Sequence, residues 1–326
     1  MKVFQTKHWL KLLVFFVSLA LGLNAWGDEN LPLPPEEFRQ LLKVGEFQIL
    51  SDKKTEHGVG GARKLSVTFS NRSQPLEVKW RVGNKVTGER WNNSPRREVA
   101  AYQFQKLFLD PPDYVVPPVA SRCIPFSVYR PIDAKAVSNL NSEVKCVFGT
   151  LTAWLQNVEM PKILYDPQRF EQDKRYAYHL GNLALLNYLI QHRDAMLDNY
   201  LISKNPQNPR MFSIDNSFTF KWEWHNIFQT HWHKIRIPAL PRKSIERLRK
   251  ISDADLERLA VLEQLEMDEN GVYRHVEPGE KIYPCDGNRF RFKTLQLGLT
   301  CVEINNLKNR LAKLLKEVDA GKWPLF

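Results

Sequence analysis

The stretch His192-Arg193-Asp194-Ala195-Met196-Leu197-Asp198-Asn199 decides how this chain is interpreted, together with Ile214-Asp215-Asn216. Asp215 lies sixteen residues beyond Asn199, and the turn residues of 203–210 predict a hairpin between them. A carboxylate can accept a proton, and an amide oxygen with a second carboxylate can hold a hard divalent cation. Taken alone, the first segment is also compatible with a buried ion-pair cluster of His, Arg and Asp.

The spacing of the first segment fits the pattern H-R-D-x-x-x-x-N, which forms the catalytic loop of protein kinases. Phosphoryl transfer requires a base for the acceptor hydroxyl and oxygen ligands for the metal ion on ATP. Asp194 is therefore predicted to be the catalytic base. Asn199 and Asp215 are predicted to be the ligands of Mn²⁺ or Mg²⁺, with ATP as co-substrate.

Residues 47–125 have the alternating pattern of strands, with a glycine-rich turn and one helix among them. Residues 47–50, 64–69 and 76–82 are predicted strands. The turn between the first two contains Gly58, Gly60 and Gly61, whose backbone N–H groups are candidates for contact with nucleotide phosphates. A plain hairpin is the alternative, since the third glycine of the usual kinase loop is missing.

A helix is predicted from Pro95 to Phe108, because Ser94 can cap it and Pro95 suits its first position. Glu98 lies in the first turn of this helix, and Lys79 lies on the preceding strand. This arrangement predicts the strand-lysine to helix-glutamate ion pair that positions ATP phosphates in kinases. Solvated surface is the alternative for any such pair of charges.

These segments resemble the secretory-pathway kinases of the Golgi casein kinase group and their bacterial relatives. The resemblance covers roughly residues 45–320. In sequence order it rests on Val78-Lys79, Glu98-Val-Ala-Ala-Tyr102, Val116-Pro-Pro-Val119, Gly149-Thr-Leu-Thr-Ala-Trp154-Leu155, the loop ending at Asp194, and Asp215-Asn216. It implies an α+β, two-lobed protein-kinase-like fold with a β-rich small lobe and a helical large lobe.

The resemblance also implies roles: Lys79 on the nucleotide phosphates, Glu98 paired with it or near a metal, and Asp194 as base. Two departures stand out. The family usually places Arg-His after the aspartate, whereas here His192-Arg193 precede it. Ser217 stands where the family has glycine. Because serine has less backbone freedom than glycine, it would stiffen the loop after Asp215.

The predicted organisation is a signal peptide at 1–27, an N-terminal arm at 28–46, a small lobe at 47–150 and a large lobe at 151–326. Residues 173–191, 245–266 and 302–318 have helical periodicity. The segment 218–233 is rich in tryptophan and histidine, but without a nearby carboxylate or cysteine set it is interpreted as an aromatic surface loop rather than a zinc site.

The N-terminus predicts export. Lys2, Lys7 and Lys11 precede an apolar run from Leu12 to Leu23, and Ala25-Trp26-Gly27 supplies the small residues of a cleavage site. The run is shorter than the ~20 residues that span a bilayer. We therefore expect a secreted or periplasmic protein, or a lumenal one in a eukaryote, with membrane attachment only if the segment stays uncleaved.

Four cysteines agree with an oxidising compartment. Three pairings are possible, and Cys123–Cys146 with Cys285–Cys301 is favoured because each then closes a short loop within one presumed lobe. Four buried, reduced thiols are the alternative.

The chain has 47 Lys and Arg against 36 Asp and Glu, and without the three lysines of 1–27 the remaining 44 give a formal charge of +8. No dense basic run or RNA-binding signature indicates a nucleic-acid partner. The expected function is phosphorylation of exported proteins on Ser or Thr, or of glycans. The alternative is a catalytically silent kinase fold that binds and activates a partner.

Overall fold

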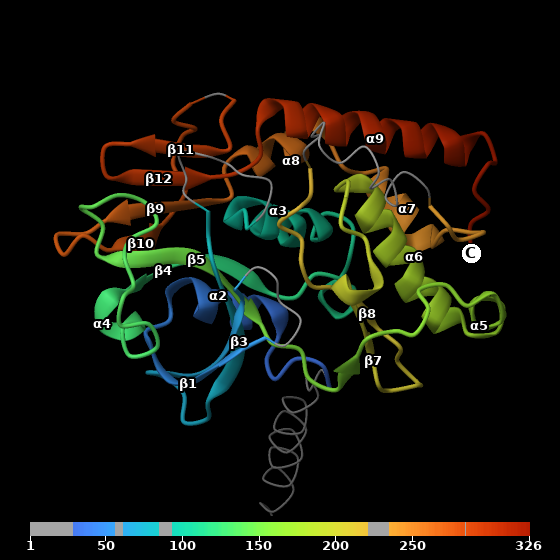
Figure 1. Cartoon of the computed structure of the whole chain (residues 1–326). Coiled ribbons are helices and arrows are strands. Elements are labelled where there is room, and N and C mark those ends of the chain that lie inside the picture. The colour runs from blue at the N-terminus through green and yellow to red at the C-terminus, as the bar shows by residue number, and fades with distance from the viewer. Residues whose placement is uncertain (1–28, 56–60, 85–92, 221–234, 284) are drawn as a thin grey trace, which may run out of the picture.

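The computed structural model describes residues 29–55, 61–84, 93–220, 235–283 and 285–326, which form an α+β fold with antiparallel sheets (Figure 1). The predicted class is thus confirmed as α+β, whereas the division into two lobes at residue 150 stays a prediction. The signal-peptide prediction lies outside the described residues. Within the described ranges, no helix is long and apolar enough to span a membrane.

A five-stranded sheet in the order β1-β2-β3-β5-β4 carries the N-terminal part of the chain. Its strands are β1 (Phe47–Lys54), β2 (Arg63–Phe69), β3 (Leu76–Val82), β4 (Val119–Pro125) and β5 (Cys146–Ala153). The three strands predicted before residue 83 are therefore present. Next to this sheet lie α3 (Pro95–Gln105), the predicted helix, and the short α4 (Phe126–Tyr129).

The predicted N-terminal arm is in fact a structural helix, α2 (Pro35–Val44), which packs on β4 and β5. Pro35 starts it and Gly45 follows its last turn, as helix ends prefer. Phe38 and Leu42 are completely buried with the apolar side chains of β2 and β3. Proline and acidic residues in the first turn suit a helix start as well as an arm, so composition alone was misleading here.

The second main core is helical. It is built around α6 (Lys174–Leu189) and α9 (Cys301–Asp319), which match two of the predicted helices. The smaller elements of this part are α5 (Pro167–Gln172), α7 (Arg242–Leu248), α8 (Asp253–Glu257), and 3-10 turns at Pro111–Asp113, Leu197–Asn199 and Arg258–Ala260. A three-stranded sheet of β6 (Val158–Glu159), β7 (Tyr200–Ser203) and β8 (Met211–Ser213) carries the predicted hairpin.

The continuous helix predicted over 245–266 is wrong. The chain forms α7, then α8 with a capping box at Ser252, and then strand β9 (Glu263–Met267). The new cap at Ser252 restarts the helix, and the following residues Glu263–Met267 pair with β10 (Tyr273–Val276) and β12 (Thr294–Leu297) as a strand. With β11 (Asn288–Arg291), these strands form a four-stranded sheet in the order β10-β9-β12-β11.

Both predicted disulfides are present. Cys123–Cys146 joins the paired strands β4 and β5, and Cys285–Cys301 ties the loop before β11 to the first residue of α9. The described chain has no free cysteine. Two disulfides fit an oxidising, extracytoplasmic compartment.

A buried ion cluster joins α3 to α9. Glu303 pairs with Arg96 at 2.6 Å and with Arg97 at 3.4 Å, and all three side chains are at most 4% exposed. Glu303 also accepts a bond from the backbone N–H of Thr300, as part of the capping box that starts α9. Because Glu98 follows these two arginines, the cluster fixes the helix turn that carries it.

Glu303→Gln is expected to lower the free energy of unfolding by about 3–5 kcal/mol, because it removes the buried negative charge that Glu303 places against two buried guanidinium groups. Glu317→Gln is the matched control, since Glu317 lies on the same helix and its partner Lys322 is mostly exposed. The control should change stability by less than about 1 kcal/mol. Urea unfolding of both variants measures the difference, and equal losses would show that the cluster is not the stronger contact.

Candidate functional site

The predicted catalytic loop follows directly from α6. Asp173 caps the start of this helix, and the chain leaves its end through Gln191, whose φ is 54°. The loop then brings Asn199 back to Asp194: the amide Nδ2 of Asn199 donates to Asp194 Oδ2 at 2.9 Å and to its carbonyl at 2.8 Å. The two side chains predicted as base and metal ligand are therefore in contact.

His192 and Arg193 anchor the start of this loop in the protein interior. His192 is fully buried, and Arg193 lies over the ring of Phe218 with its backbone N–H bonded to the Phe218 carbonyl. Asp194 is only partly buried, and its carboxylate accepts a bond from Asn199. The first two residues of the motif are thus structural, and the third is presented to solvent, which does not fit a wholly buried three-residue cluster.

Asp215 lies two residues past β8, where it contacts β3 directly and its neighbour Asn216 contacts α3. Arg81 Nη1 of β3 contacts Asp215 Oδ1 at 2.5 Å, and the Ser217 hydroxyl donates to the same oxygen at 3.1 Å. The next backbone N–H, that of Asn216, donates to Glu98 Oε2 of α3 at 3.1 Å. Ser217, a departure from the family pattern, therefore holds the side chain of Asp215.

Lys79 points to the same place, but without the predicted ion pair. Its Nζ donates to the carbonyl of Ile214 at 3.1 Å, and within the described chain it is not paired with Glu98. The direct Lys79–Glu98 contact predicted from the sequence is therefore wrong for this state. Both side chains instead flank Asp215, one through Ile214 and the other through Asn216.

Arg81 is the site residue that sequence reasoning missed. It lies two positions after Lys79 on β3, and alternate residues of a strand share a face. The same alternation that identified the strand was therefore a signal that Arg81 would accompany Lys79.

The carboxyl groups of the site have different pKa values. Burial, with the nearby charge of Asp215, raises the pKa of Glu98 to about 7, despite the opposing effect of Lys79 and Arg81. Burial would raise the pKa of Asp215 too, but Lys79 and Arg81 outweigh it and lower that pKa to about 2. Burial also raises the pKa of Asp194, against its bond from Asn199. Asp215 is thus the carboxyl group of the site that most favours its charged form.

The donor set fits a hard divalent ion. Asn199 uses its N–H group on Asp194, which leaves its amide oxygen to face a ligand, and Asp215 adds an ionised carboxylate. Mg²⁺ is commonly bound by one or two such oxygens together with substrate phosphates. In the described ranges, no group of three or more His, Cys, Asp or Glu is arranged to hold a metal. An ion beside Asp215 would therefore have few ligands from the described residues.

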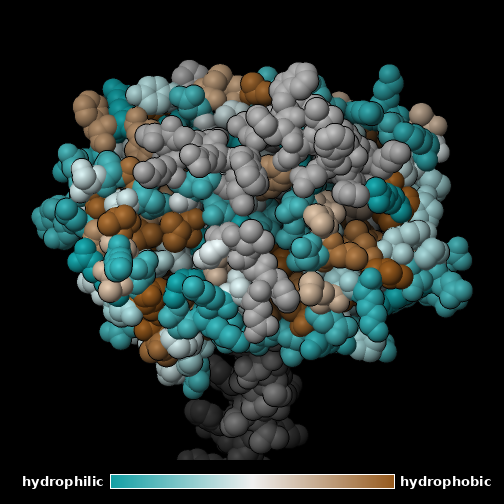
Figure 2. Space-filling view, in the orientation of Figure 1, coloured by the Kyte–Doolittle hydropathy of each residue, from teal (hydrophilic) through white to brown (hydrophobic). Residues whose placement is uncertain are grey.

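The remaining predicted nucleotide contacts are only partly described. Gly61 precedes β2 with φ 71°, a conformation that favours glycine, whereas Gly58 and Gly60 lie outside the described residues. Most of the aromatic segment, residues 221–234, lies outside them as well. In the orientation of Figure 1, the coloured surface is mainly hydrophilic, with apolar residues in several separate groups (Figure 2).

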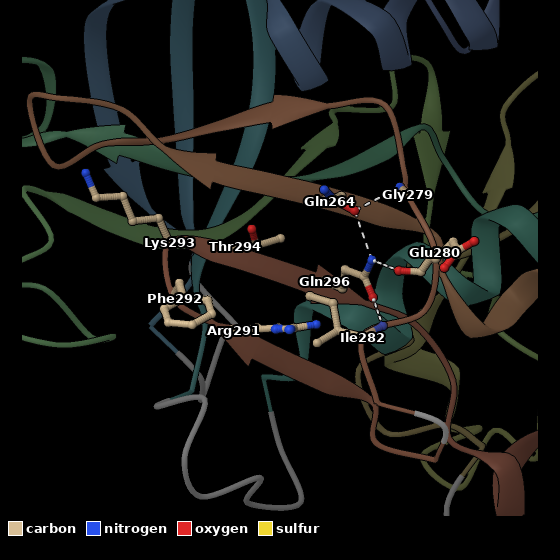
Figure 3. A pocket seen from close by; sticks show the side chains of 9 residues that line it. All are labelled: Gln264, Gly279, Glu280, Ile282, Arg291, Phe292, Lys293, Thr294 and Gln296. Carbon is tan, nitrogen blue, oxygen red and sulfur yellow. Dashed lines mark hydrogen bonds between the residues drawn. The ribbon is translucent and has the colours of Figure 1, made fainter.

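A groove of about 580 Å³ lies elsewhere, on the four-stranded sheet (Figure 3). Its floor is an amide pair: Gln296 Nε2 donates to Gln264 Oε1 at 2.9 Å and to the Glu280 carbonyl at 2.7 Å. None of the residues that line the groove belongs to the candidate site.

Comparison with known proteins finds likenesses among solved structures only. No family model matches the sequence, and no curated protein matches it. Among solved structures, the chain is similar to one described as the crystal structure of the Golgi casein kinase, with a TM-score of 0.46 and 10% identity over 87% of this chain and 74% of that chain. We base the functional conclusion on the site instead.

The pKa of Glu98 predicts a specific pH dependence of stability in metal-free protein. A carboxyl whose folded pKa is raised from 4.5 to about 7 stabilises the fold fully below pH 4.5, and this contribution is lost as the pH rises through 7. Glu98→Gln retains an acceptor for the Asn216 N–H but cannot ionise. We expect the melting temperature of Glu98→Gln minus that of wild type to increase from pH 5 to pH 8.

Buried histidines also make the stability of the fold depend on pH. The quantity to measure is therefore the difference in melting temperature between variant and wild type. Burial lowers the pKa of His192 to about 4 and that of His179 to about 4, which makes folding more favourable as the pH rises. Both proteins share this effect, and it cancels in the difference. Thermal unfolding with EDTA at pH 5, 6, 7 and 8 gives the result, and a difference independent of pH would contradict the prediction.

Proposed function

We propose that this protein is an ATP-dependent phosphotransferase that acts on hydroxyl groups of exported proteins, or of glycans. The observation that carries the proposal is the meeting of three separate segments at Ile214. Its carbonyl accepts a bond from Lys79 of β3, and its N–H donates at 3.1 Å to the carbonyl of Asn199, which holds Asp194, while Asp215 is the next residue. Each segment supplies a group that phosphoryl transfer requires. The export prediction and the two disulfides support exported acceptors.

In this proposal Asp194 orients the acceptor hydroxyl and accepts its proton. The bond from Asn199 holds one carboxylate oxygen, so the carboxylate keeps a fixed direction while its other oxygen stays available. Burial raises the pKa of Asp194, which makes it a better proton acceptor than a fully solvated aspartate.

Lys79 supplies positive charge for the nucleotide phosphates, and the Ile214 carbonyl holds its ammonium group beside Asp215. Asp215 and the amide oxygen of Asn199 would hold Mn²⁺ or Mg²⁺. When bound, such an ion neutralises the charge on the phosphate oxygens. Glu98 fixes the backbone next to Asp215 through the Asn216 N–H and places a further carboxyl group near the cations.

Two observations favour the alternative, a catalytically silent scaffold that binds and activates a partner. Lys79 is not paired with Glu98, and Arg81 occupies an oxygen of Asp215. A site that never exchanged these contacts would bind no metal–nucleotide complex productively. Phosphate transfer by the wild-type protein separates the two functions.

Asp194→Asn and Asp215→Asn are expected to differ. The first should retain binding of metal–ATP and reduce turnover by about 10²–10⁴-fold, the usual contribution of a general base. The second should also lose metal-dependent ATP binding, because it removes the charged oxygen ligand. Calorimetric titration, together with transfer of labelled phosphate to an extract of exported proteins and glycans, measures both.

Asp198→Asn is the matched control, because Asp198 lies exposed in the same loop. It should bind and turn over like wild type. If wild type binds ATP and stimulates another kinase, yet transfers phosphate to no acceptor and not to water, the scaffold function is correct and the phosphotransferase is rejected.

A further inference from the structure

Arg81 places a second positive charge directly on the proposed metal ligand. Its Nη1 lies 2.5 Å from Asp215 Oδ1, and its side chain is 7% exposed. Lys79, on the same face of β3, is bonded one residue away at the Ile214 carbonyl. Two cations from one strand thus converge on a single carboxylate.

The exposure of the two partners distinguishes this pair from the structural ion cluster of the fold. Arg96 and Glu303 are 1% and 4% exposed, so neither side chain can be reached from solvent. Asp215 is 24% exposed and Arg81 is 7% exposed, so a ligand from solvent can reach the carboxylate and, beside it, the guanidinium bonded to it. Solvent therefore reaches this ion pair mainly at the Asp215 carboxylate.

The charges around Asp215 disfavour a bare metal ion. A divalent cation that approaches this carboxylate meets Lys79 and Arg81 as well, and like charges at short range in a poorly solvated site repel strongly. A nucleotide changes this balance, because its phosphates are negative and offer oxygen atoms to both cations. Arginine is suited to such an exchange, since its planar guanidinium binds carboxylate and phosphate with similar geometry.

We propose that Arg81 makes metal binding conditional on the nucleotide: it holds Asp215 while the site is empty and exchanges this carboxylate for a nucleotide phosphate when metal and nucleotide enter together. The inference rests on the proposed function, because it assumes that the site takes ATP. In this proposal Arg81 is a positioning residue: its charge controls when Asp215 is available to the metal ion.

The test compares the affinity for Mn²⁺ alone with the affinity for Mn²⁺ in the presence of a non-hydrolysable ATP analogue, by calorimetry. Wild type should bind Mn²⁺ alone at least about tenfold more weakly than Arg81→Gln does, because the variant lacks the repelling charge. Arg81→Gln should also bind the analogue more weakly, so that the coupling between the two ligands falls. Arg81→Lys, which retains the charge, should bind Mn²⁺ alone as weakly as wild type.

Arg63→Gln is the matched control. Arg63 pairs with Asp52 on β1, and its register partner on β3 is Trp80, so it lies on the opposite face of the same sheet from Arg81. It removes an equal charge from an equivalent kind of pair and should leave both affinities at wild-type values. Circular dichroism and thermal unfolding establish that each variant is folded.

Two results would overturn the inference. If wild type binds metal and analogue together but Arg81→Gln binds Mn²⁺ alone no better than wild type, the proposed role of Arg81 is wrong while the nucleotide site stands. If Arg81→Lys behaves like Arg81→Gln, the effect comes from packing rather than charge. Failure of wild type to bind the analogue with any metal would instead reject the proposed function itself.

Discussion

The buried cluster of Glu303 with Arg96 and Arg97 is the contact on which the rest of the site depends. Taking three charged groups out of water is costly, and this cost is offset only while all partners remain in place. The cluster therefore fixes α3 against the first turn of α9. The Cys285–Cys301 disulfide constrains that same turn from the other side.

This constraint reaches the site through one residue. Glu98 directly follows Arg97, and its carboxyl group accepts the N–H of Asn216, next to Asp215. Because α3 cannot turn without breaking the cluster, Glu98 cannot leave Asn216 easily. The backbone at Asp215 is thus held in place by contacts that lead to Glu303 of α9, more than eighty residues later in the sequence. The moving parts of this site are therefore expected to be side chains rather than the helix.

Much of the fold could be predicted where one local pattern dominated. The strands before residue 83, the helices α3, α6 and α9, and the hairpin 203–210 all have a clear period or turn chemistry. The cysteine pairs could be predicted because short loops favoured one pairing. The prediction failed at α2 and at 245–266, where proline, caps and acidic residues suit more than one structure.

The site could be predicted in composition but not in contacts. Sequence spacing indicated Lys79, Glu98, Asp194, Asn199 and Asp215, and the structure brings these residues together, yet their roles stay proposals. The sequence could not show that Lys79 bonds to a carbonyl or that Ser217 supports Asp215, since both contacts depend on the path of the backbone after β8. Arg81 is not part of the motif that identifies Lys79, so only the shared face of β3 could indicate it.

The same arrangement gives the two carboxyl groups near Lys79 opposite properties. Asp215 has direct contacts with Arg81 and Ser217, so its negative charge is stabilised and its pKa is low. Glu98 accepts a neutral backbone N–H and is more deeply buried, so its negative charge is poorly stabilised and its pKa is high. A cation that enters between them would favour ionisation of Glu98, because it adds the positive charge that Lys79 does not supply at contact distance. A cation bound at Asp215 would therefore be coupled by charge to the ionisation of Glu98, even with α3 fixed in place.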